Sequence, residues 1–301
     1  MNDKAGINYL ISGPSHLPNL VVSLYSLRAV GLWTGPIFVH AWPESFGIIE
    51  QIARDERLSI EVFEREPAYR GKNSQFLDKI QVMQECPTKV GMYLDADTIA
   101  CRTFDELIYE AELYGFCATQ FNDWTTQIGT VKRRIERLVE REPINQESVQ
   151  IALTQRLPSV NGGVFACRHD SIVLPTWYDW TYAVKDIFIA DETVLHACMV
   201  EYDSTGSFSV LHGGSWNCSP KYMPRHAQDK QVRIWHFHGD SNLRPSKSQK
   251  GFDLWWPRYQ QCLNMNIGNI LDWKDDCRNK YLPLLEREHD NEATSVATSR
   301  R

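Results

Sequence analysis

Short apolar runs alternate with segments of helical periodicity along the first 120 residues of the chain. The apolar runs predict strands at residues 7–12, 36–41, 58–63, 90–94 and 115–120. The segments between them predict helices at residues 19–30, 44–55, 74–85 and 104–111. Strands that alternate with short helices favour an α/β fold, in which helices flank a mainly parallel sheet. In such a sheet, ligands bind beyond the carboxyl ends of the strands.

The pattern is less regular in the second half of the chain. Residues 123–157 are polar and charge-rich, and we interpret them as a helical insertion. The run N-G-G-V-F-A predicts a turn that leads into a strand ending at residue 168; helices at 175–184 and 191–199 and late strands at 208–212 and 232–237 follow. We expect one domain over residues 1–250, a helical and aromatic extension over 251–285, and a disordered tail over 286–301.

The predicted strand at 90–94 ends in two aspartates, Asp95 and Asp97. Residues two apart in a strand point to the same face, so both carboxylates can converge on one point. Two carboxylates held together need a cation, and a hard divalent ion is the usual partner. A solvated turn that happens to carry two acids is the alternative that the pair alone leaves open.

Two histidines, His236 and His238, lie two apart at the end of the last predicted strand, and they share one face if that strand is regular. Together with the aspartates, one of them would complete an Asp, Asp, His site that suits Mn²⁺, or Mg²⁺ with a poorer fit. Such a metal would bridge phosphate oxygens and offset the charge of a departing diphosphate. The alternative is a pair of hydrogen-bonded core histidines.

Charge and cysteine usage narrow the function classes. A net charge of -6 gives no electrostatic reason to bind nucleic acid or an anionic membrane. The eight cysteines form no C-x-x-C pair, which argues against a zinc site. No signal peptide precedes Ile7 and no apolar run has the length of a transmembrane segment, so we expect a soluble cytoplasmic protein, with peripheral membrane association left open.

Four motifs in this order resemble a known family: Y-L-D-A-D-T, N-G-G-V-F-A, D-E-T-V-L-H and H-F-H-G. They are similar to the motifs of GT-A-fold glycosyltransferases of family 8, the retaining glycogenin- and galactosyltransferase-like enzymes. The resemblance covers roughly residues 7–245 and marks the chain as a divergent member. It implies a GT-A (Rossmann-like) mixed, mainly parallel sheet flanked by helices.

The resemblance also implies roles for individual residues. Asp95, Asp97 and His236 match the metal ligands. Asp191 and Glu192 match the family's Asp-Gln pair near the reacting carbon, with Glu192 in place of glutamine, and Lys79 matches a lysine that meets the donor sugar or its phosphates. The positions implied to contact the donor are Ser12, Gly13, Lys79, Asp95, Asn161, Gly162, Gly163, Gly239 and Asn242. Helix capping by Asp191 and an exposed helix cation at Lys79 are the structural alternatives.

Two features depart from the family pattern. Where the family has a diphosphate-binding lysine, this chain has Asn242, so Arg244 or Lys247 would have to supply the cation. The spacing between Asp97 and Asn161 is also longer, because of the predicted insertion.

The expected function is metal-dependent transfer of a hexose from a nucleotide diphosphate sugar, a UDP-sugar in the first place, to a hydroxyl of an unknown carbohydrate, lipid or protein acceptor, with retention. Three rivals remain. A haloacid-dehalogenase-type phosphatase also ends a strand in D-x-D. In that family glycine and threonine usually follow the second acid, whereas this chain has Thr98 and Ile99. A nucleotidyltransferase carries a basic glycine-rich loop that S-G-P-S-H-L-P lacks. A sugar-nucleotide-binding module without turnover is the third.

Overall fold

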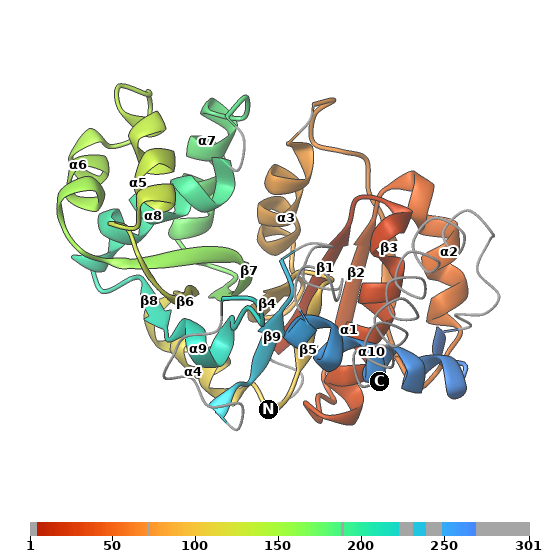
Figure 1. The fold of residues 1–301 in the computed structure, drawn as a ribbon. Helices are drawn as coiled ribbons and strands as arrows, with labels where there is room; N and C mark the ends of the chain where they lie inside the picture. Colours follow the sequence, from red (N-terminus) through yellow and green to blue (C-terminus); the bar gives the residue numbers. More distant parts are fainter. Residues whose placement is uncertain (1–4, 72, 188–189, 223–230, 239–248, 269–301) are drawn as a thin grey trace, which may run out of the picture.

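A seven-stranded mixed sheet forms the centre of the molecule (Figure 1). The structure is a computed structural model, and it describes residues 5–71, 73–187, 190–222, 231–238 and 249–268. The strand order is β3-β2-β1-β4-β7-β6-β8. The strands are β1 Ala5–Ile11, β2 Ile37–Ala41, β3 Glu61–Glu64, β4 Val90–Leu94, β6 Phe116–Thr125, β7 Pro158–Arg168 and β8 Ser209–Leu211. Since β3, β2, β1 and β4 are parallel and β6 pairs with β8 in parallel, the predicted mixed, mainly parallel sheet is confirmed.

The direction of β7 was not predicted. This strand lies between β4 and β6 and runs antiparallel to both, with Leu94 opposite Val164 and Cys117 opposite Ala166. As a result, the first half of β7 lies beside the carboxyl end of β4, at the edge where ligands are expected.

The prediction of a turn at Asn161-Gly162-Gly163 was wrong, because all three residues lie inside β7. The register against β6 shifts here: Ala118 faces Phe165, whereas the next residue of β6 faces Asn161. Glycine pairs are typical of turns, but these two glycines keep an extended backbone that passes close to side chains from other elements. The predicted strand at 58–63 was also too long, since Ser59 has a φ of 48° and the strand begins at Glu61.

Helices cover both faces of the sheet (Figure 1). In β7, Val164 and Ala166 belong to one apolar core and Phe165 and Cys167 to the other, as expected for a strand buried on both faces. The first core includes residues of α1 Leu17–Ala29, α2 Pro43–Ala53, α4 Asp105–Tyr114, α9 Gly213–Trp216 and α10 Gln249–Asn264. The second includes residues of α3 Ser74–Gln84, α5 Gly129–Ile135, α6 Gln146–Thr154, α7 Val173–Ala183 and α8 Ala190–Asp203.

A separate two-stranded sheet joins distant parts of the chain. It pairs β5 Thr98–Ala100 with β9 Ile234–His236, antiparallel, with Thr98 opposite His236. Because β5 begins directly after Asp97, this pairing brings the late histidine to the acidic pair.

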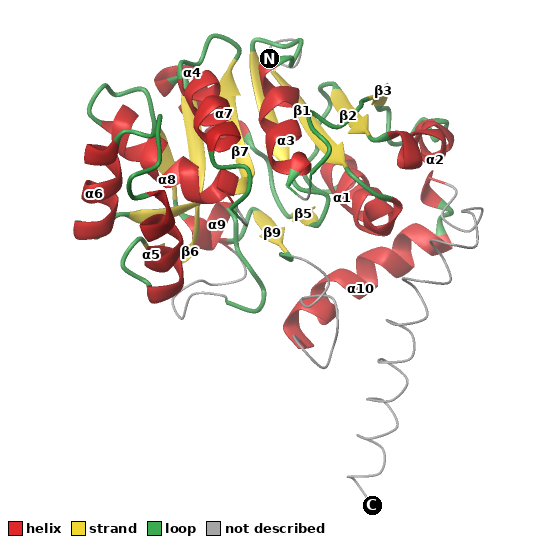
Figure 2. Cartoon of the chain, turned by 90° about the horizontal axis from the view of Figure 1, so that it is seen from above, coloured by secondary structure: helices red, strands yellow, loops and turns green. Residues whose placement is uncertain are grey.

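The segment read as an insertion begins as strand, because β6 continues to Thr125, and then forms α5 and α6. Its apolar residues Val131 and Val149 are buried in the second core, so the segment contributes to the packing around α8. Beyond residue 250, α10 lies beside α1 (Figure 2) and buries Trp255 and Tyr259. The predicted tail at 286–301 lies outside the described residues. No helix among the described ranges has the length and apolar character needed to cross a membrane.

Candidate active site

Asp95, Asp97 and His236 form one cluster at the carboxyl end of β4. Their ligand atoms all lie within 4.8 Å of one another. Nε2 of His236 is 3.1 Å from Oδ1 of Asp97 and 3.4 Å from Oδ2 of Asp95. The histidine side chain is 3% exposed, whereas that of Asp95 is 34% exposed, so the cluster is buried on one side and open on the other.

Backbone hydrogen bonds hold the two acids in place from two sheets. The amide of Asp95 donates to the carbonyl of Gly163 in β7 at 2.8 Å, and the amide of Phe237 donates to the carbonyl of Asp97 at 2.9 Å. The backbone of Asp95 is therefore held by β7 of the large sheet, and that of Asp97 is held by the residue that directly follows β9. This arrangement limits how far the carboxylates can move apart.

His236 presents Nε2 to the acids because its other ring nitrogen is occupied. Nδ1 lies 2.8 Å from Oδ1 of Asn217, a residue with no exposed surface. Burial alone would lower the pKa of His236, but the charges of Asp97 and Asp95 outweigh it and raise this pKa to about 9.

These residues fit a divalent metal ion. Two carboxylates and an imidazole nitrogen are the mixed donor set that suits Mn²⁺. The hydrogen bond from Nδ1 to Asn217 fixes the orientation of the ring, as is usual for a ligating histidine. His238 is a poorer candidate: its ring lies against that of His236 at a centroid distance of 3.7 Å and an interplanar angle of 32°, and burial lowers its pKa well below the usual value. The prediction that a histidine from the last strand meets the acidic pair is confirmed for His236.

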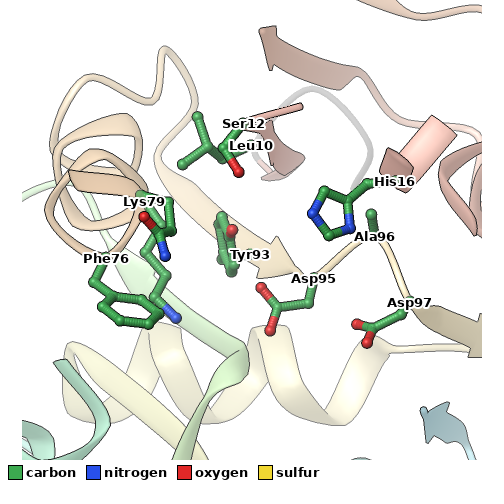
Figure 3. A pocket seen from close by; sticks show the side chains of 10 residues that line it. Leu10, Ser12, His16, Phe76, Lys79, Tyr93, Asp95, Ala96 and Asp97 are labelled. Carbon is green, nitrogen blue, oxygen red and sulfur yellow. The ribbon is translucent and has the colours of Figure 1, made fainter. Parts of the chain in front are cut away.

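A pocket of about 240 Å³ opens beside the acids (Figure 3). Lys79 and Asp95 point into it from opposite sides, and Ser12 lies at its far wall. Gly13 directly follows Ser12 and precedes a short turn that brings His16 to the pocket. The ends of β1 and β4 and one face of α3 thus share a single cavity, as the parallel sheet predicts.

Lys79 and Asp191 form a buried ion pair at the wall of this pocket. Nζ of Lys79 is 2.6 Å from Oδ2 of Asp191, and their side chains are 8% and 2% exposed. Burial lowers the pKa of Lys79, but Asp191 and Asp95 outweigh this and raise it. Nζ also donates to the carbonyl of Gly162 at 3.2 Å. The alternative of an exposed helix cation at Lys79 is therefore wrong.

Glu192 joins the site to the predicted insertion. Its Oε2 accepts a hydrogen bond from Nδ2 of Asn161 at 3.2 Å, and its Oε1 lies 3.3 Å from the guanidinium of Arg134 in α5. Burial raises the pKa of Glu192 to about 7, although Arg134 opposes the shift. This carboxyl group can therefore change its charge near neutral pH.

The two glycines of β7 face opposite sides of the sheet. A Cβ at Gly162 would lie 3.1 Å from Nζ of Lys79 and 3.2 Å from Oδ2 of Asp191. A Cβ at Gly163 would instead collide with two members of the metal cluster, at Cε1 of His236 and at Oδ2 of Asp95. Because successive residues of a strand alternate in direction, this one dipeptide lies against both halves of the site.

The structure thus brings together most of the residues singled out from the sequence: Ser12, Gly13, Lys79, Asp95, Asp97, Asn161, Gly162, Gly163, Asp191, Glu192 and His236. Gly239 and Asn242, with Arg244 and Lys247, lie outside the described residues. Sequence reasoning missed Asn217 and Arg134. Neither belongs to a periodic or closely spaced motif, and each reaches the site through a partner more than 15 positions away.

Comparisons with known proteins agree on the fold. No protein-family model matches the chain, and no curated protein does. Among solved structures, the chain resembles the glycosyltransferase GlyE of Streptococcus pneumoniae TIGR4, at 12% identity and a TM-score of 0.56 over 89% of this chain and 64% of that one. It resembles the galactosyltransferase LgtC in complex with donor and acceptor sugar analogues, at 14% identity and a TM-score of 0.57 over 85% of this chain and 95% of that one.

A third similar structure is the bifunctional glycosyltransferase WbbM in its apo form, at 9% identity and a TM-score of 0.57 over 86% of this chain. The chain spans half of WbbM and slightly under two thirds of GlyE. At these identities the likeness concerns the fold, and it confirms the resemblance to glycosyltransferases at that level. The chain has the GT-A-like fold of these glycosyltransferases.

Proposed function

We propose that this protein is a metal-dependent glycosyltransferase that moves a hexose from a nucleotide diphosphate sugar to an acceptor hydroxyl. The observation that carries the proposal is the Asp95, Asp97 and His236 cluster, whose two acids line a pocket that Lys79, itself paired with the buried Asp191, also lines. A binding site for a divalent cation next to a buried cation–carboxylate pair suits a ligand with a diphosphate at one end and a polar sugar at the other.

Each part of the site has a defined task in this proposal. Mn²⁺ or Mg²⁺ held by Asp95, Asp97 and His236 would supply charge stabilisation to the departing diphosphate. Ser12 and Gly13 close the pocket at the end of β1, where the nucleoside would lie. Holding the donor and acceptor in line contributes much of the barrier reduction in such a site.

Lys79 and Asp191 would bind the sugar portion. Oδ2 of Asp191 is paired with Lys79, while Oδ1 is buried and has no hydrogen-bond partner among the described residues. A buried carboxylate oxygen without a partner is costly, and a sugar hydroxyl donating to it would remove that cost. In this proposal the same carboxylate would stabilise positive charge that develops at the reacting carbon.

The similar solved structures support a sugar donor. LgtC was crystallised with donor and acceptor sugar analogues, and another LgtC structure carries an active-site glutamine-to-glutamate change. Separately, the family resemblance matches Asp191 and Glu192 to the family's Asp-Gln pair, with glutamate in this chain where the family has glutamine. A UDP-hexose donor and retention of configuration are the finer parts of the proposal, and they rest on that resemblance.

The test is a screen of sugar nucleotides for hydrolysis that depends on Mn²⁺, which requires no knowledge of the acceptor. We expect hydrolysis of one UDP-hexose by the wild type and none by Asp97→Ala, with unchanged circular dichroism. Unchanged donor affinity of Asp97→Ala in calorimetry with Mn²⁺ would refute the site. Donor binding without any hydrolysis would instead support a binding module, and phosphate release from a model ester without a sugar nucleotide would support a phosphatase.

A further inference from the structure

Asn217 lies between His236 of the metal cluster and Asn161 of β7, and it contacts both. It follows α9, has no exposed surface, and its side-chain amide makes three hydrogen bonds. Nδ2 donates to Oγ1 of Thr119 and to Oδ1 of Asn161, both at 2.9 Å. Oδ1 lies 2.8 Å from Nδ1 of His236. All three partners are side chains from different strands, β6, β7 and β9.

The network itself determines which way this amide faces. The backbone N–H of Gly163 can only donate, and it donates to the Asn161 side chain at 2.9 Å, so the Asn161 atom there is oxygen. The Asn217 atom 2.9 Å from that oxygen must then be the amide nitrogen, which turns the amide oxygen toward His236. An amide oxygen can only accept a hydrogen bond, so Nδ1 of His236 carries a hydrogen, and in the neutral ring the free lone pair is on Nε2.

We propose that Asn217 is a positioning residue that selects the metal-binding tautomer of His236 and links the metal cluster to Asn161 and Glu192. The link is one chain of hydrogen bonds, from His236 to Asn217, from Asn217 to Asn161, and from Asn161 to Glu192 at 3.2 Å. This inference rests on the proposed metal site. Its consequence is that the metal affinity and the positions of Asn161 and Glu192 depend on the same buried amide.

Two substitutions of Asn217 separate its two roles. Asn217→Leu keeps the branched shape and the number of heavy atoms but removes both the acceptor for His236 and the donors to Asn161 and Thr119. Asn217→Asp keeps an acceptor for His236, as in the carboxylate–histidine–metal arrangement, but loses both donors. Asn73→Leu is the matched control, because Asn73 is a buried asparagine that donates two hydrogen bonds, to the carbonyls of Lys185 and Ile187, and neither acceptor belongs to the cluster.

We expect Asn217→Leu to weaken Mn²⁺ binding about 10–100-fold, the usual cost of losing the hydrogen-bond partner of a ligating histidine. Calorimetry measures the affinity, and pulsed electron paramagnetic resonance of bound Mn²⁺ measures the ¹⁴N coupling of the histidine ligand, which we expect to weaken. Asn217→Asp should keep the affinity and the coupling at or above wild type, while raising the KM for the sugar nucleotide. Asn73→Leu should leave the affinity and the coupling unchanged even where it lowers the stability.

Wild-type Mn²⁺ affinity and coupling in a folded Asn217→Leu protein would overturn the proposal, and so would equal losses of affinity in the Asp and Leu variants. A wild type that binds Mn²⁺ with a ¹⁴N coupling but hydrolyses no sugar nucleotide would refute the proposed function while leaving the role of Asn217 supported. A wild type that binds no Mn²⁺ would overturn both.

Discussion

Replacing Gly163 with alanine provides the sharpest test of the metal cluster. The added Cβ would approach Cε1 of His236 and Oδ2 of Asp95 more closely than the 3.0 Å that real Cβ atoms essentially never cross. Ordinary contact begins at 3.4 Å, so both groups would have to retreat by more than 0.4 Å (3.4 minus 3.0). Metal–ligand distances tolerate deviations of about 0.2 Å. The alanine variant therefore cannot keep both ligands in place.

We expect Gly163→Ala to lower Mn²⁺ affinity about 100-fold, which corresponds to about 2.8 kcal/mol of binding free energy. The same crowding should lower the free energy of unfolding by about 1–3 kcal/mol, the usual cost of overpacking. Calorimetric titration with Mn²⁺ measures the first quantity, and urea denaturation of the metal-free protein measures the second.

Two other glycines provide controls for this experiment. Gly47 lies in α2 and a Cβ there would meet nothing within 4 Å, so Gly47→Ala should stabilise the helix by about 0.5–1 kcal/mol and leave metal binding unchanged. Gly162→Ala crowds Lys79 and Asp191 by only a few tenths of an ångström, so it should affect donor binding more than metal binding. A folded Gly163→Ala protein with wild-type Mn²⁺ affinity would refute the described geometry of the cluster.

Three further predictions concern the ionisable groups. Lys79→Met leaves the carboxylate of Asp191 buried without its cation and should cost about 3–5 kcal/mol in urea denaturation, whereas Lys79→Met combined with Asp191→Leu should recover most of that loss. Burial lowers the pKa of His236, but the neighbouring carboxylates outweigh it and raise it to about 9, so Mn²⁺ binding at pH 7 should release about one proton, measurable by calorimetry in two buffers with different ionisation heats. In the metal-free protein this raised pKa contributes stability that is fully present below pH 6.5 and lost as the pH rises through about 9; a metal-free stability that instead increases over this range in the wild type, relative to His236→Gln, would contradict the assignment. Since burial raises the pKa of Glu192 to about 7, Glu192→Gln should flatten the pH dependence of donor affinity within about one unit of pH 7, and an unchanged profile would show that Glu192 does not titrate in the site.

The parallel half of the sheet could be predicted from the sequence because short apolar runs alternate there with segments of helical periodicity. The acidic pair could be predicted as well, since Asp95 and Asp97 are adjacent in space for local reasons. His236 needed more than local reasoning: its approach to the acids depends on the pairing of β5 with β9. The ordered motifs of the family supplied that information, which periodicity does not contain.

The parts that escaped prediction depend on long-range packing. The direction of β7 is set by its two neighbours, and the Gly162-Gly163 pair has the same local signature in a turn as in a crowded strand. Asn217 is 56 positions from Asn161 and 19 from His236, and nothing in its local sequence marks it as a contact of both. The residues that hold the ligands in place are therefore harder to read from sequence than the ligands.

The pairing of β5 with β9 also affects the order in which the site is completed during synthesis. His236 is made 139 residues after Asp97 (236 minus 97), when the parallel half of the sheet already has all its strands. Until then the nascent chain holds two carboxylates without the imidazole, a set that binds divalent ions only as hydrated and exchangeable partners. A product that ends before Ile234 would keep the pocket wall of β1 and β4 but lack the third ligand. In the proposed metal site, tight retention of Mn²⁺ would therefore require that Ile234–His236 has been made and has paired with β5.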